Sequence, residues 1–129
     1  YKTPNAIDIG VNGATVVATH SGTATLGQEG CGSKYVIIAS SCGSVPFQSY
    51  YGHLGAILIK NGQNVTVGQT IAISDDTGNT GNPATRCSTG PHLHFQFFPT
   101  TNTIPATQKP YLKRNIPIGC TNLPGNMCN

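Results

Sequence analysis

Ser88-Thr-Gly-Pro-His92-Leu-His94-Phe-Gln-Phe97 is the stretch that decides how this chain folds. Side chains on a β-strand alternate between two faces, so His92 and His94 are predicted to point the same way. The opposite face would carry only apolar side chains and suit a core: Leu93, Phe95 and Phe97. Paired imidazoles can hold a metal, or one can hold it while the other handles protons. The alternative is a pair of surface histidines on an edge strand. The preceding Gly-Pro pair, the clean apolar face and the scarcity of histidine favour the functional interpretation.

The composition predicts one all-β domain. The chain has 129 residues, with 16 Gly and 9 Pro, which indicates short strands joined by many turns. Only 9% of the residues are charged and the net charge is +3, which argues against nucleic acid as the main partner. The one basic cluster, Lys109, Lys113 and Arg114, is interpreted as a solvated tail. No apolar run approaches the length of about 20 residues that a membrane span needs.

Five cysteines in a chain of low charge favour an oxidising compartment. The expected location is therefore extracellular, at the cell surface or periplasmic. No Cys-x-x-Cys pair is present, so a four-thiolate zinc site is not expected. The predicted bridges are Cys31–Cys87 and Cys120–Cys128. An odd number of cysteines leaves at least one thiol free or paired with another chain, and Cys42 is available for such an intermolecular bond.

Short strands are expected along the whole first part of the chain. Residues 5–12 form a strand on which Asp8 faces away from the apolar side, either as a ligand or as an ordinary solvent-facing residue. Residues 14–26 are predicted to be two strands meeting near Ser21-Gly22, with His20 exposed just before that turn. Residues 34–39 and 49–54 are expected to pair as a hairpin, and His53 would lie at the end of the second strand.

Turn signals divide the rest of the chain. Residues 62–74 are predicted to be turn, short strand, turn and strand, with a purely structural role. Residues 75–91 form a long polar loop, and a loop of this length in a compact domain is often a binding loop. Residues 99–129 are rich in proline and contain two cysteines. They are predicted to be an extended tail that packs on the same domain.

Several of these stretches together resemble the lysostaphin/LytM-type zinc metallopeptidases from about Asn5 to Phe98, and the predicted domain spans residues 1–98. The resemblance rests on Asn-Ala-Ile-Asp-Ile at 5–9, Tyr-Val-Ile-Ile at 35–38, Tyr-Gly-His-Leu at 51–54, Gly-Gln-x-Val-x-Val-Gly-Gln-x-Ile at 62–71 and Ser-Thr-Gly-Pro-His-Leu-His-Phe at 88–95. It implies a compact antiparallel β-sheet domain with an open groove, of the duplicated-hybrid-motif kind. It also implies a substrate class, the short peptides that cross-link bacterial peptidoglycan.

The resemblance further implies roles for four residues. Asp8 falls on the zinc-binding aspartate of the family's H-x-x-x-D motif, and His94 on the zinc-binding second histidine of H-x-H. His92 falls on the first histidine of H-x-H, which acts on protons, and His53 on a second catalytic histidine, which stabilises the attacked carbonyl. The first histidine of H-x-x-x-D is replaced by Pro4, which offers no side-chain ligand.

Two kinds of function follow from this incomplete ligand set. With zinc bound, the domain is a cell-wall metalloendopeptidase that hydrolyses amide bonds. Without it, the domain is a degenerate, metal-poor module that binds peptidoglycan or a protein partner and acts as an activator. A structural part of a surface assembly, with the tail as its docking arm, is a third reading. Zinc content separates the first two.

Overall fold

The computed structural model describes residues 6–42 and 45–99. Those residues contain eight strands and no helix, which confirms the all-β prediction. The predictions for Pro4, the basic cluster, the Cys120–Cys128 bridge and the C-terminal tail fall outside the described residues, as does the side chain of Cys42. The strands are β1 (Ala6–Ile9), β2 (Thr15–Val17), β3 (Gly22–Gln28), β4 (Lys34–Cys42), β5 (Val45–Ile57), β6 (Asn64–Val65), β7 (Thr70–Ser74) and β8 (Leu93–Pro99).

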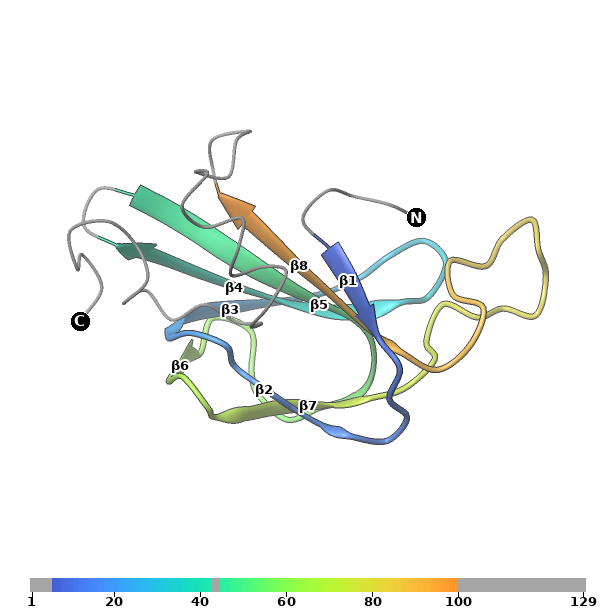
Figure 1. Cartoon of the computed structure of the whole chain (residues 1–129), viewed down its shortest axis with the longest axis horizontal. Helices are drawn as coiled ribbons and strands as arrows, with labels where there is room; N and C mark the ends of the chain where they lie inside the picture. Colours follow the sequence, from blue (N-terminus) through green and yellow to red (C-terminus); the bar gives the residue numbers. More distant parts are fainter. Residues whose placement is uncertain (1–5, 43–44, 100–129) are drawn as a thin grey trace.

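The strands form an antiparallel sheet in the order β1-β8-β5-β4-β3-β6, and β7 joins β2 to β5 (Figure 1). The long strands β4, β5 and β8 lie side by side, and the β2–β7 pair lies beneath them. The segment between β7 and β8 extends beyond one end of the sheet. Chain segments from the two ends of the described sequence, β1 and β8, are therefore neighbours.

The two faces of β8 differ as the alternation of its sequence predicts. Phe95 and Phe97 are buried in the core, and Leu93 packs partly against it. Phe95 pairs with Tyr51 of β5, and the two rings meet edge to face at 5.4 Å. Ring pairs of this kind add about 1 kcal/mol beyond the burial of their area. The opposite face of β8 is left for His94 and the polar groups around it.

A bulge interrupts β5 at Gly52 and His53. Tyr51 pairs with Val36 and Leu54 pairs with Lys34, so β5 carries one more residue here than β4. Both Tyr51 and Leu54 are buried in the core, which strict alternation would not allow for residues three apart. His53 has a φ of 59°, an uncommon value for a residue other than glycine. The bulge turns its side chain away from the core, as bulges beside active sites often do.

Two predictions about residues 14–26 are wrong. Residues 14–26 do not form a hairpin, because β2 pairs with β7 and β3 pairs with β4 and β6. His20 is not exposed: it is 3% exposed and packs edge-on against Phe47. The predicted 34–39 and 49–54 hairpin is confirmed, but its strands extend to Cys42 and Ile57. His53 therefore lies within a strand and not at its end.

The other tested expectations hold. Cys31 and Cys87 form a disulfide across 56 residues of sequence. Residues 62–74 contain the short strand β6 and the strand β7, as predicted. Within the described part of the chain, no helix is long and apolar enough to cross a membrane.

Candidate active site

Asp8 and His94 meet because they are directly opposed in the β1–β8 ladder. Asp8 Oδ1 lies 2.9 Å from Nδ1 of His94 and 3.6 Å from Nε2 of His92. The Asp8 side chain is 57% exposed, whereas that of His94 is only 10% exposed. One carboxylate oxygen is thus shared by two imidazoles at the mouth of the site.

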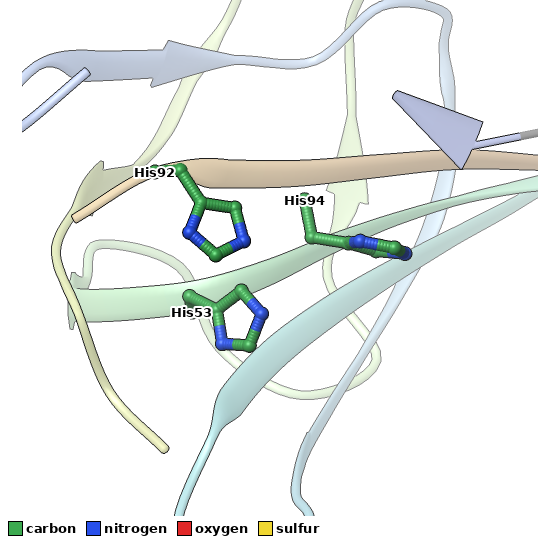
Figure 2. Close-up of side chains that lie close together, drawn as sticks. All are labelled: His53, His92 and His94. Carbon is green, nitrogen blue, oxygen red and sulfur yellow. The ribbon is translucent and has the colours of Figure 1, made fainter. Parts of the chain in front are cut away.

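His53 reaches the same point from β5 (Figure 2). Its ring centre lies 4.5 Å from that of His92 and 6.1 Å from that of His94. Nδ1 of His53 is 2.8 Å from the carbonyl oxygen of Thr77 and 3.1 Å from the hydroxyl of Ser33. A carbonyl can only accept a hydrogen bond, so Nδ1 carries the proton. Nε2 then presents a lone pair to the site.

His92 is held in the same way. Its Nδ1 lies 2.7 Å from the carbonyl oxygen of Gly90, which again fixes the proton on Nδ1 and leaves a lone pair on Nε2. Metal-ligating and proton-accepting histidines are commonly oriented by such a bond to a backbone carbonyl. His53 and His92 therefore both direct basic nitrogens at the space beside Asp8.

His94 differs from the other two because it has acceptors at both ring nitrogens. Nδ1 faces Asp8, and Nε2 lies 3.3 Å from Oε1 of Gln96 on the same face of β8. When Nε2–H donates to Gln96, Nδ1 is free to offer its lone pair to a cation held next to Asp8. Tyr50 closes the other side of His94, with its ring edge-on at 5.8 Å and its hydroxyl bound to Glu29.

The start of the two-histidine strand is anchored by Asp76. One Asp76 oxygen accepts a 2.6 Å hydrogen bond from Ser88, and the other accepts a 2.8 Å bond from Asn79. Desolvation pushes the pKa of Asp76 upward, but these two hydrogen bonds, together with the charges of His53 and His92, hold the pKa below its ordinary value. Asp76 remains an anion that fixes the approach of the long loop to His92.

Burial lowers the pKa of His53 below its ordinary value. The hydrogen bond to Thr77 opposes this shift, whereas the charges of nearby His92 and His94 add to it. His53 is consequently neutral near pH 7, which is the form that accepts a proton.

The four residues line one cavity of about 620 Å³. Its volume is within the range of ordinary small-ligand sites. Most of the lining residues besides the histidines are polar or charged, and Cys87 of the Cys31–Cys87 disulfide lies in one wall. The lining residues are Asp8, Glu29, Tyr50, His53, Pro83, Arg86, Cys87, Ser88, Thr89, His92, His94 and Gln96.

The donors at this point suit a zinc ion. His53, His92 and His94 each place a ring nitrogen within 4.8 Å of the others, and the Asp8 carboxylate lies against two of them. One carboxylate with two or three imidazoles is a usual donor set for catalytic zinc. His20 does not contribute, because it is buried against Phe47 and Ser49.

Comparison with known proteins identifies the family of this domain. The profile of peptidase family M23 matches residues 2–106. This chain belongs to peptidase family M23. The expected resemblance to lysostaphin/LytM-type domains is thereby confirmed.

Two curated M23-like relatives share about a third of their aligned residues with this chain. An uncharacterized metalloprotease of Haemophilus influenzae is 36% identical over 94 residues, which are 70% of this chain and 18% of that protein. The peptidoglycan DD-endopeptidase ShyA of Vibrio cholerae is 36% identical over 72 residues, 56% of this chain and 14% of that protein. The chain thus spans less than a fifth of the length of these relatives.

The fold is also that of solved M23 domains. The catalytic domain of the antimicrobial peptidase lysostaphin from Staphylococcus simulans superimposes with a TM-score of 0.62 and 27% identity, covering 84% of this chain and 78% of that one. LytU gives a TM-score of 0.58 at 31% identity, covering 74% and 61%.

All four predicted site residues are brought together: Asp8, His53, His92 and His94. Sequence reasoning missed the groups that orient them, namely Ser33, Thr77, Gly90 and Gln96. Gln96 could have been found, because it follows His94 by two residues and so shares its face. The other three act through loop geometry, and the sequence carries no local signal for that.

Proposed function

We propose that this domain hydrolyses amide bonds in the peptides that cross-link peptidoglycan, as a zinc metalloendopeptidase. The observation that carries the proposal is the convergence of the Asp8 carboxylate and three imidazoles in one cavity. Membership of family M23 and the likeness to the endopeptidase ShyA support the substrate class. A substrate in the cell wall also supports an extracellular, cell-surface or periplasmic location.

Asp8 and His94 hold the metal in this proposal, through Oδ1 and Nδ1. Zinc supplies a Lewis acid that activates water and polarises the scissile carbonyl. Gln96 orients the His94 ring by accepting its Nε2 proton. Asp8 is exposed enough for the ion and a peptide to enter from solvent.

His53 and His92 handle the proton and the developing charge. Nε2 of one neutral imidazole accepts a proton from the attacking water and returns it to the leaving amine as the C–N bond breaks. The other imidazole stabilises the negative charge that grows on the carbonyl oxygen, a contribution of about 3 kcal/mol in comparable sites. The bonds from Nδ1 to Thr77 and Gly90 keep both rings in the required tautomer.

The test is hydrolysis of purified peptidoglycan by zinc-loaded protein, measured as new amino groups. Peptidoglycan with direct cross-links and peptidoglycan with interpeptide bridges should both be tested, so that both kinds of cross-link are offered to the enzyme. His94→Ala should lose activity, and Asp75→Asn, outside the cavity lining, should retain it. No amine release above the His94→Ala background on any preparation would contradict the proposal.

A second function is favoured by Pro4, which removes one ligand of the family pattern. In this alternative, the cavity binds a cell-wall peptide or a segment of a protein partner without cutting it. Co-sedimentation with peptidoglycan that persists in a chelator, together with no zinc uptake, would support the binding module over the enzyme.

A further inference from the structure

The replacement at position 4 raises the question of which atom completes the metal site. Catalytic zinc normally has three protein ligands and one open position. Asp8 and His94 supply two, and proline at position 4 supplies none. Within residues 6–42 and 45–99, the candidates for a third ligand are the side chains that already lie beside Asp8 and His94.

We infer that His92 is the third metal ligand of this domain, through Nε2. Ligand atoms around a tetrahedral zinc with bonds of about 2.0–2.1 Å lie about 3.3 Å apart. The shared oxygen of Asp8 is 2.9 Å from His94 Nδ1 and 3.6 Å from His92 Nε2, on either side of that value. The inference rests on the proposed function, because it assigns a ligand within the same zinc site.

The surroundings of His92 suit this role. The bond from Nδ1 to the carbonyl of Gly90 fixes a neutral ring with its lone pair on Nε2, which is the form that binds a metal. The Ser88–Asp76 bond holds the segment just before it. The side chain is 20% exposed, so an ion can reach the nitrogen without displacing core residues.

His53 is the competing candidate, and two observations place it second. Asp8 has close contacts with His92 and His94, whereas His53 approaches the group from β5 with its Nδ1 held by two partners. With His92 on the metal, proton transfer belongs to His53 alone.

The experiment measures zinc affinity by competition with a chromophoric chelator, using the full chain. His92→Ala should lower the affinity about 100-fold or more, since one of three ligands is lost. His53→Ala should change it by less than about fivefold. Adding Pro4→His to His92→Ala should recover most of the affinity, because the histidine of the family motif is restored.

Two further readouts are spectroscopic and do not depend on activity. Titration of Co²⁺ into the wild-type protein should give the strong visible absorption of a four-coordinate site, and His92→Ala should weaken it. In ¹⁵N spectra of the histidine rings, zinc should shift Nε2 of His92 while Nε2 of His53 moves little. The second measurement holds even if His92→Ala does not fold.

The outcomes separate this inference from the proposed function. No zinc uptake by the wild-type protein would overturn both. Tight zinc binding that is unaffected by His92→Ala, or lost equally in His53→Ala, would overturn the ligand assignment and leave a metallopeptidase standing.

Discussion

The histidines of this domain lie in two regions with opposite character. In the first region, His20 is buried, with Nδ1 bound to the carbonyl of Ser21 and Nε2 2.8 Å from the hydroxyl of Ser49. In the second, the ring nitrogens of His53 and His92 that are not tied to carbonyls face a cavity. His53 and His92 are available for chemistry because the fold ties only one nitrogen of each ring to a backbone carbonyl, whereas both nitrogens of His20 are bound within the core.

The two regions are also held together by different means. His20 belongs to a buried polar group with Ser49, Tyr51 and Thr19, surrounded by core side chains. Burial lowers the pKa of His20 and raises that of Tyr51, so both are neutral. The cavity histidines depend on loop atoms, and the loops depend on the Cys31–Cys87 bridge.

That dependence is visible at Gly78. Gly78 has a φ of 95°, and a Cβ there would lie 2.6 Å from the sulfur of Cys87 and 3.0 Å from Cβ of Ser33. The backbone beside Thr77 is thus packed directly on the disulfide and on Ser33. Both partners of His53 Nδ1 are supported by one cross-link.

The largest effect is expected from Asp8→Asn, which should impair the cavity and leave the His20 region intact. Asparagine removes the negative charge that the cation and His94 share, so zinc affinity and turnover should fall about 1000-fold. Chelator competition and amine release measure the two quantities. Asp75→Asn is the matched control. Thermal stability should stay close to wild type, and a large drop in stability would mean that Asp8 is mainly structural.

Next in size is the loss of the disulfide, in the double variant Cys31→Ser/Cys87→Ser. Opening a loop of 56 residues should reduce the free energy of unfolding by about 3–4 kcal/mol. Amide exchange should rise first around Ser33, Thr77 and Gly78. The amides near His20 should still exchange only through global unfolding, so their protection should fall only as far as the overall stability falls. An equal rise in amide exchange in the cavity region and in the His20 region would contradict the distinction between them.

His20→Ala should disrupt the buried polar group around His20. The cavity left in the core and the loss of the hydrogen bond between His20 and Ser49 together should cost about 2–4 kcal/mol, measured by urea unfolding. Zinc affinity should remain within about threefold of wild type, because the His20 ring does not line the cavity. A parallel loss of zinc would show that the two regions are coupled.

The smallest effect is a pH dependence of stability in the metal-free protein. Because burial lowers the pKa of His20 below its ordinary value of 6.5, the unfolded chain binds the proton more readily. The stability that neutral His20 contributes is fully present above pH 6.5 and is lost as the pH falls through the folded-state pKa of His20. His53 contributes in the same direction. His20→Gln should therefore flatten the slope between neutral and mildly acidic pH without removing it, and an unchanged slope would exclude His20 as its source.

The sequence predicted the parts of the site that depend on alternation and motif. His92, His94 and the apolar residues between them follow the period of a strand, and Asp8 was identified as outward-facing. It did not predict that His53 lies at a bulge, because nothing local to Gly52-His53 distinguishes a bulge from a strand end. The burial of His20 was missed for a related reason. Its ring packs against Phe47 and Ser49 of β5, far along the chain, and nothing close to His20 in the sequence indicates that contact.

The position of Asp8 on β1 has a consequence for how the ion is captured. Among the described strands, β1 is four residues long and pairs only with β8. A ligand on such a short border segment can detach with its strand, so the affinity for zinc includes the free energy of docking residues 6–9. Zinc binding and the docking of β1 on β8 are then coupled, so each event makes the other more favourable.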